Sequence, residues 1–414
     1  MPHIASSSRD DMRLLATRTH RFQHGYRDKA CPAPRAHRCL AVLVACFLCI
    51  MYEDQGGAAE LWQYGGFADV SYASTGHHPE NHQWRSKETS TRTNELAPNI
   101  GLLYVRKDPA EQSRWGVELA FQAGYDTDDL VPEPKADGTR PVSGADTLRH
   151  VARANVSYLA PIGRGVTFSA GLMKGSKTYE EFYAKYNLNY TRAYITDYNP
   201  NFVMGLGASY PITKSLELGV YVINAYRHLA HTNDAPSYLS KMEWRVSDHL
   251  TVYENLYYGP DQRATSVDYW RTFSDSTVEW RKPDWRVALS YNVGTEKMAD
   301  VSGSPRAVWM GAALFTQRHL VGPWSIAVRP ECYWDPQGRM TEHEQLLWAN
   351  TTTLEYKKHL GQQLIIVRLE HRYDRSTGSQ GGFFRDGFSA PGVPRLAADQ
   401  HLTILGVILA FDSA

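Results

Sequence analysis

The chain has 414 residues, of which 43% are hydrophobic, and its 44 Lys and Arg residues equal its 44 Asp and Glu residues in number. This balance excludes the strongly basic surface that neutralises nucleic-acid phosphates, so no nucleic-acid partner is expected. The mean hydropathy of −0.45 would suit a soluble protein, but a transmembrane β-barrel averages to such a value too, because its strands alternate apolar and polar faces.

The first predicted element is a short apolar run at residues 39–51. Basic residues precede it, among them Arg27, Lys29, Arg35 and Arg38. It is too short to span a bilayer as a helix, and the small residues Gly56 to Ala59 follow it. A basic region, an apolar core and a small-residue exit are the parts of a secretory signal peptide. We therefore expect residues 1–59 to be an N-terminal extension with a signal peptide, and residues 60–414 to be the mature domain.

The cysteine count determines whether the exported chain can form internal disulfides. Four of the five lie in this leader, and Cys332 alone remains in the mature domain, so no disulfide framework is predicted. A lipoprotein cleavage box at Leu43 to Cys46 is the weaker alternative, because few apolar residues precede that cysteine.

Strands with a two-residue period follow the leader. The clearest runs from Arg114 to Asp126, where apolar side chains from Trp115 to Tyr125 alternate with polar or small ones. It exceeds the ~5–6 residues of an average soluble strand and satisfies the ~9–11 that a tilted membrane strand needs. Residues 166–173, 216–222 and 285–294 repeat the pattern.

Short and long connections alternate along the mature chain. The short turns lie at 107–113, 160–165, 211–215, 246–248, 282–284, 321–323 and 359–361. The long loops lie at 74–96, 127–146, 175–200, 227–236, 260–272, 296–305, 335–344 and 375–400. These connections join sixteen strands, so the first (near 62–73) and the last (near 401–412) can pair. The predicted fold is all-β: a transmembrane up-and-down antiparallel β-barrel of about 16 strands, with short periplasmic turns and long external loops.

Aromatic residues make up 12% of the chain, and many of them flank the short turns. We predict an aromatic girdle at one bilayer interface, formed by Trp115, Tyr158, Tyr210, Trp244, Trp280, Trp285, Trp324 and Tyr356.

Several motifs resemble the outer-membrane β-barrel porin family that includes the OmpL-like, porin-2-type proteins. They are Tyr64 to Asp69, Tyr179-Glu180, Asn187 to Arg192, Pro200 to Tyr210 and Val222 to Tyr226. The resemblance covers essentially the whole mature chain and implies a channel without naming a solute. The chain departs from the family at Ala225 and Tyr226. Phe411 is also followed by three further residues, whereas many such barrels end on an aromatic residue.

The loop at 175–200 is the third long loop, and in general porins of this size that loop narrows the pore. By this analogy Glu180, Glu181, Lys185 and Arg192 are predicted to line the constriction, where facing charges of both signs sort solutes. The alternative is an external loop with solvated charges.

The barrel wall should carry inward-facing charges that a packed core could not hold. By alternation these are Glu118, Arg153, Glu217, Arg286, Arg329, Arg368, Glu370 and Arg372. Because the set mixes both signs, strong ion selectivity is not predicted.

No catalytic or metal site is predicted. The sequence contains no Gly-x-Ser-x-Gly, Walker loop or HExxH motif. His77, His78, Glu80 and His82 are residue types that bind zinc, but their spacing does not match that of ligand pairs, so we expect a solvated loop and no cofactor.

The sequence therefore predicts a passive channel for small hydrophilic solutes in a bacterial outer membrane, with membrane lipid and those solutes as its partners. One alternative is a sugar-specific channel, in which the rings of the third loop would stack on the solute. Those rings are Tyr179, Phe182, Tyr183, Tyr186, Tyr190 and Tyr194. A further alternative is an outer-membrane enzyme or adhesive barrel. Porins of this size are often trimers, so fold analogy suggests a homotrimer.

Overall fold

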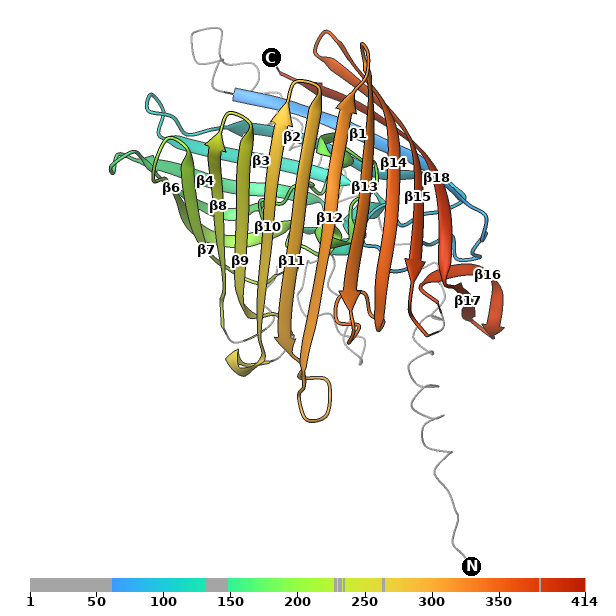
Figure 1. Ribbon diagram of the computed structural model, residues 1–414. Helices are drawn as coiled ribbons and strands as arrows, with labels where there is room; N and C mark the ends of the chain where they lie inside the picture. The colour runs from blue at the N-terminus through green and yellow to red at the C-terminus, as the bar shows by residue number, and fades with distance from the viewer. Residues whose placement is uncertain are drawn as a thin grey trace, which may run out of the picture. The chain divides into compact units, whose positions relative to one another are not determined.

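The computed structural model describes residues 62–130, 148–226, 235–262, 265–379 and 381–413, with Leu229 and Asn233. The expected signal peptide and its cleavage point lie outside these residues. Sixteen of the described strands form one closed antiparallel barrel (Figure 1). They are β1 (Trp62–Thr75), β2 (Leu96–Lys107), β3 (Trp115–Ala123), β4 (Val151–Ala160), β5 (Val166–Lys174), β6 (Phe202–Pro211), β7 (Leu216–Ile223), β8 (Ser237–Ser247), β9 (Leu250–Pro260), β10 (Trp270–Lys282), β11 (Trp285–Lys297), β12 (Arg306–His319), β13 (Trp324–Asp335), β14 (Gln345–Leu360), β15 (Gln363–Ser376) and β18 (Asp399–Asp412).

The barrel closes between its first and last strands. β1 pairs antiparallel with β18 from Gly65 opposite Asp412 to Thr75 opposite Leu402. Closure leaves no free strand edge, so every ladder can satisfy its backbone groups within the protein, as a bilayer requires. The prediction of a sixteen-stranded barrel, with pairing of the first and last strands, is confirmed.

The last long connection contains a separate two-stranded sheet of β16 (Phe383–Ala390) and β17 (Val393–Ala397). Residues Asp386–Arg395, which include the tip of this hairpin, form part of a different compact unit from the barrel. Short helices lie in other connections: η3 (Tyr125–Leu130), η4 (Ala184–Tyr186), α4 (Tyr194–Asp197) and η5 (Val267–Tyr269). None of the helices in the described ranges is long and apolar enough to cross a membrane.

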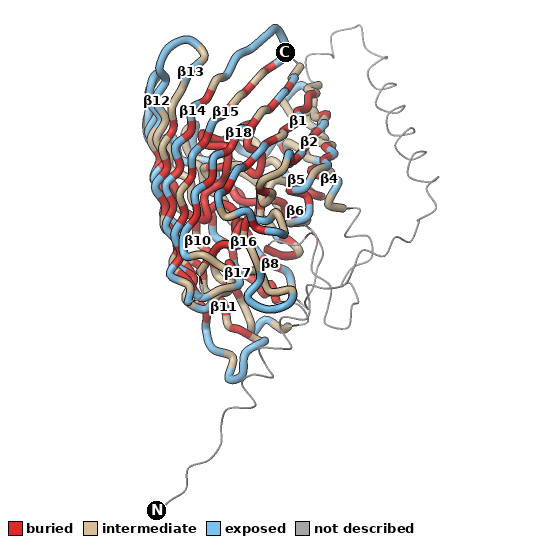
Figure 2. The backbone as a smooth tube through the Cα atoms, turned by 90° about the vertical axis from the view of Figure 1, so that its right-hand side faces the viewer, coloured by how far each residue is buried: buried red, intermediate tan, exposed pale blue. Residues whose placement is uncertain are grey.

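Side chains alternate between the two faces of the barrel wall. On β15, Leu369 is exposed on the outer face, while its neighbours Arg368 and Glu370 are buried on the inner face. Buried positions recur along the strands in this way (Figure 2). Buried inner residues from strands around the barrel pack with buried residues of a loop inside it, so much of the interior is a packed core.

The strand predicted from Arg114 to Asp126 ends earlier than its alternation suggests. β3 stops at Ala123, and Tyr125 begins η3. Gly124 causes the change, because its φ of +139° favours glycine and a Cβ there would lie 2.2 Å from the Asn99 carbonyl oxygen. Asp126 is consequently buried, and it accepts a hydrogen bond of 2.8 Å from the Ser90 amide.

Candidate functional site

The connection between β5 and β6, residues 175–201, lies inside the barrel; we call it the third loop. Its backbone reaches the opposite wall. The Tyr190 amide donates to Glu370 at 2.6 Å, and the Tyr194 amide donates to Glu331 at 2.6 Å. Asn292 of β11 donates to the Ile195 carbonyl at 2.7 Å. The loop therefore crosses the interior from β5 and β6 to the wall between β11 and β15.

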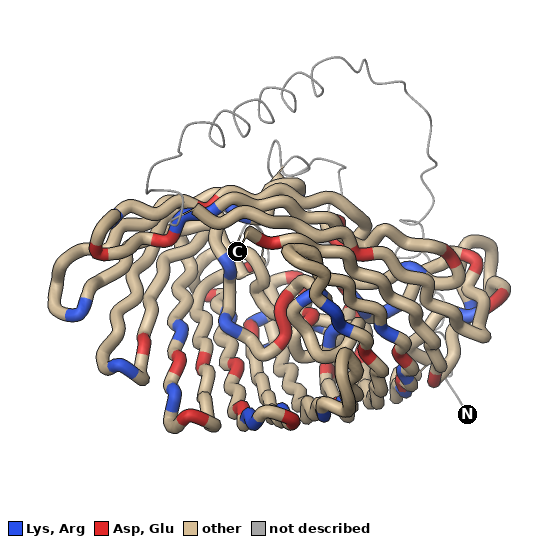
Figure 3. The backbone as a smooth tube through the Cα atoms, turned by 90° about the horizontal axis from the view of Figure 1, so that it is seen from above, with Lys and Arg blue, Asp and Glu red and all other residues tan. Residues whose placement is uncertain are grey.

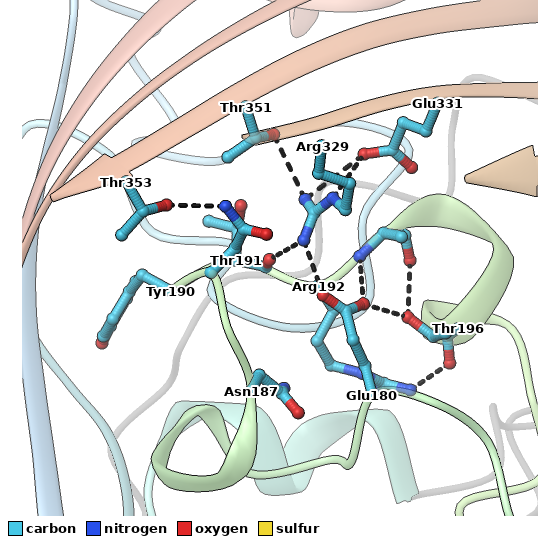
Figure 4. Close-up of polar contacts among 12 residues, drawn as sticks. Glu180, Asn187, Tyr190, Thr191, Arg192, Thr196, Arg329, Glu331, Thr351 and Thr353 are labelled. Atoms are coloured by element: carbon cyan, nitrogen blue, oxygen red, sulfur yellow. Dashed lines mark hydrogen bonds and ion pairs between the residues drawn. The ribbon is translucent and has the colours of Figure 1, made fainter. Parts of the chain in front are cut away.

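Glu180 fastens the third loop to the wall through Arg329 of β13 (Figure 4). One Glu180 oxygen lies 2.6 Å from Arg329 Nη1. The other accepts hydrogen bonds from the Ala193 amide at 2.7 Å and from the Thr196 hydroxyl at 2.6 Å. Glu180 and its three partners are all buried. Each oxygen of the carboxylate therefore has a charged or hydrogen-bonding partner within the protein.

Two more arginines of the wall bind the loop backbone. Arg368 donates to the carbonyls of Ala184 at 2.6 Å and Asn187 at 2.5 Å, and it pairs with Glu355 at 2.7 Å. Arg372 donates to the Arg192 carbonyl at 3.1 Å, and it pairs with Glu331 and Asp374. A guanidinium has five donors in a rigid fork, which suits it to hold an irregular backbone that lacks a strand ladder.

The first loop, residues 76–95, reaches the third loop through one ion pair. Lys87 Nζ lies 2.7 Å from Asp197, and both side chains are fully buried. Asp197 also accepts hydrogen bonds from the Glu88 amide at 2.8 Å and from the Thr89 hydroxyl at 2.6 Å. Burial alone would raise the pKa of Asp197, but the cations of Lys87 and Arg192 and these hydrogen bonds lower it to about 2. Burial lowers the pKa of Lys87, and Asp197 opposes that effect.

The four residues predicted to line a constriction have different surroundings. Glu180 and Arg192 are only 1% and 2% exposed, so their side chains do not face open water. Lys185 lies 2.8 Å from Asp412 of β18. Glu181 lies 2.5 Å from Lys174, and about a third of its side chain is exposed. The analogy indicated where the loop goes, but it could not show that Glu180 bonds to the wall and that Arg192 bonds to Asp197 and Asn201 within the loop, so that neither faces a pore.

The eight predicted wall residues separate into two groups. Arg329, Arg368, Glu370 and Arg372 are fully buried against the third loop. Glu118, Arg153, Glu217 and Arg286 lie on strands away from these anchors, and Glu217 and Arg286 are exposed. Charges of both signs occur around the barrel (Figure 3).

Among the described residues, two cavities lie inside the barrel beside the loop. One, of about 190 Å³, is lined by Lys174, Lys177, Glu217, Tyr221, Lys241 and Glu243. The other, of about 420 Å³, lies at the end with the short turns and is lined in part by Lys185, Arg286 and Lys357. The sequence reasoning missed Lys174, Lys177, Lys241, Glu243 and Lys357. The alternation of β8 and β14 could have identified three of these, namely Lys241, Glu243 and Lys357, as inward-facing.

The eight residues expected to form a girdle lie at the ends of strands next to short turns. Trp115 of β3 and Tyr158 of β4 pack with their ring centroids 4.7 Å apart. Trp324 of β13 and Tyr356 of β14 pack at 5.1 Å. Five of the set are exposed: Trp115, Trp244, Trp280, Trp285 and Trp324. Exposed tryptophans at one level of a barrel suit a bilayer interface.

The aromatic rings of the third loop are mostly unavailable to a solute. Phe182, Tyr183, Tyr190 and Tyr194 are buried. Phe182 packs edge-to-face on Phe202, and Tyr190 donates a hydrogen bond of 2.5 Å to Asp69. Tyr186 is 49% exposed. The four buried rings are packed within the protein and cannot stack on a sugar. Most of the aromatic surface that suggested a sugar-specific channel is therefore not accessible to a solute.

Two histidines of the first loop, His77 and His82, form hydrogen bonds to backbone carbonyls. His77 Nε2 lies 2.7 Å from the Asp399 carbonyl, and His82 Nδ1 lies 3.0 Å from the Thr93 carbonyl. In the described ranges, no three His, Cys, Asp or Glu residues are grouped so that they could hold a metal ion.

The sequence matches one protein family, and the fold is similar to those of solved outer-membrane porins. Residues 62–411 match the family described as "Putative beta-barrel porin-2, OmpL-like". No curated protein matches the sequence. An anion-selective porin from Comamonas acidovorans superimposes with a TM-score of 0.50 at 11% identity, covering 84% of this chain and 99% of that one. OmpF of Salmonella typhi, in complex with daunomycin, gives 0.50 at 9% identity, covering 84% and 97%. At these identities the likeness shows the fold alone.

Proposed function

The chain belongs to the beta-barrel porin-2, OmpL-like family, and from this premise we propose that it is a passive diffusion channel of a bacterial outer membrane for small hydrophilic solutes. One observation carries the proposal: a loop anchored inside a closed barrel leaves cavities lined by charged side chains. A closed wall with a polar, narrowed lumen sorts solutes by size and charge without any chemical step.

We propose that the third loop narrows the channel by its position. Glu180 and Arg192 hold the loop in place through buried contacts. Glu181 pairs with Lys174, which lines the smaller cavity, and Lys185 lines the larger one. On this proposal, the solute passes between the loop and the wall formed by β7 and β8, whose inward side chains Glu217, Lys241 and Glu243 line the smaller cavity.

The test is single-channel conductance of the mature protein, residues 60–414, refolded and inserted in a planar bilayer. Ohmic steps on the nanosiemens scale would support a diffusion channel. Absence of steps from protein that circular dichroism and heat-modifiability show to be folded would contradict it, and an enzymatic or adhesive barrel would then be favoured. We propose no catalytic activity for the chain.

We further propose that the barrel assembles as a homotrimer. The support is Glu254 of β9, which lies on the outer face between Val252 and Leu256. It accepts hydrogen bonds from the hydroxyls of Ser274, at 2.8 Å, and Ser276 on β10. A carboxylate in the apolar band costs free energy when it faces lipid. Contact with polar groups on a second copy of the chain would reduce that cost. Cross-linking in native membranes tests the oligomeric state.

A further inference from the structure

The larger cavity lies at the short-turn end of the barrel, between the tip of the third loop and the wall; we call it the basin. Its volume is about 420 Å³, within the range of small-molecule sites. Residues from four separate parts of the chain line it: 185–188 of the third loop, the turns after β10 and β12, and β14. It is therefore formed only when the loop is in place.

Two ionisable groups that line the basin are already compensated by residues beyond it. Lys185 pairs with Asp412 at 2.8 Å. Glu355 pairs with Arg368 at 2.7 Å. Neither pair adds much net charge to the basin, because each charge has an opposite charge within contact distance.

The remaining charges of the basin are mostly positive. Arg286 of β11 and Lys357 of β14 line it, and among the described residues neither side chain forms an ion pair or hydrogen bond. The imidazoles of His319 and His359 line it as well. Only one carboxylate, that of Asp284 in an exposed turn, remains to offset them. Clefts with one prevailing sign of charge concentrate counter-ions.

We infer that the basin binds small carboxylates that carry two or more negative groups, and that the channel therefore admits such solutes at its short-turn mouth. Arg286 and Lys357 come from different strands, with β12 and β13 between them. An anion with separated carboxylates can reach both at once. The Arg286 guanidinium can bind one carboxylate through two parallel hydrogen bonds, and the Lys357 ammonium can bind another as a point charge. This inference rests on the proposed channel function and names its solute class.

The first test is calorimetric titration of the folded mature protein with citrate at low ionic strength, which requires no conductance. We expect wild-type protein to bind citrate, and the double variant Arg286→Gln/Lys357→Gln to bind it about 10- to 100-fold more weakly. Arg318→Gln is the matched control. Arg318 lies on the outer face near the same end of the barrel, 5.3 Å over the Trp285 ring, and its loss should leave citrate affinity unchanged.

Three results would overturn the inference: no citrate binding by the wild type, equal weakening in the control and the double variant, or inorganic phosphate binding as tightly as citrate. Phosphate carries its charges on a single centre and cannot bridge the two cations. A second test is citrate block of single channels, which we expect from the short-turn side and not in the double variant. A folded protein that binds citrate but never conducts would contradict the channel function while supporting the basin.

Discussion

Glu180 Oε1 and Arg329 Nη1 lie 2.6 Å apart, although 149 residues separate them in the sequence. One residue belongs to a loop and the other to the barrel wall, so this contact determines where the loop lies. Both side chains are buried. A buried ion pair contributes little net stability, but removal of one partner leaves an uncompensated charge.

We therefore expect Arg329→Gln to release the third loop. Loss of the cation leaves Glu180 and Glu331 buried without it, which should lower the free energy of unfolding by about 3–5 kcal/mol. The channel should also conduct more, because the loop no longer holds its place. Heat-modifiability and single-channel recording measure the two effects. An exposed-charge control in the turn between β2 and β3, Glu111→Gln, should change neither stability nor loop position. Comparable loss in both variants would contradict the anchoring role.

The ion pair of Asp197 with Lys87 should survive mild acid. The pKa of Asp197 is lowered to about 2 in the folded protein, against about 3.9 for an unfolded aspartate. Its stabilisation is therefore fully present above about pH 4 and is lost as the pH falls through about 2. Thermal midpoints between pH 2 and pH 6 should show this loss in the wild type and not in Asp197→Asn. A wild-type midpoint that is flat down to pH 2 would argue against the contact.

Asp126 should have the opposite dependence on pH. Burial raises its pKa to about 8, against the lowering effect of the Ser90 amide hydrogen bond. Because the pKa of Asp126 is higher in the folded protein than in the unfolded one, its contribution to the free energy of unfolding is greatest below about pH 4. That contribution is lost as the pH rises to about 8. Asp126→Asn should consequently stabilise the protein at pH 8 by several kcal/mol (on the order of 1.4 kcal/mol per unit of pKa shift) and leave it nearly unchanged at pH 4. Equal effects of the substitution at both pH values would show that Asp126 is already ionised at pH 4 in the folded protein.

Removal of the carboxylate on the outer face should affect assembly more than folding. Glu254→Leu places an apolar side chain among apolar neighbours, so a barrel surrounded by lipid tolerates it. If Glu254 contacts polar groups of a second copy, as proposed, its removal takes away a reason for association. The variant should then shift the trimer toward monomer in native gels. Val252→Leu on the same face is the control. An unchanged trimer in Glu254→Leu would remove the support that this residue gives to self-association.

Local periodicity was sufficient to predict the architecture, because a strand places alternate residues on opposite faces wherever it pairs. The short and long connections then established the strand count and the pairing of β1 with β18. The exception at Gly124 also has a local cause. Period two continues through Tyr125 and Asp126 in the sequence, yet a positive φ turns the chain out of the sheet.

The candidate site depended on contacts that no local pattern encodes. The alternation showed that Arg329, Arg368 and Arg372 face inward, but it could not distinguish a wet wall from one covered by a loop. Nor could it separate Glu180, which is buried, from its neighbour Glu181, which is partly exposed.

The sequence by itself determined a sixteen-stranded barrel with an apolar outer face and a charged inner one, because strand period and turn spacing are properties of neighbouring residues. Only the tertiary structure decided which inward charges meet water. Irregular backbone in the interior must satisfy its amides and carbonyls wherever donors and acceptors happen to be close. For the third loop these partners are Glu370, Glu331 and Arg368, which lie far from it in the sequence.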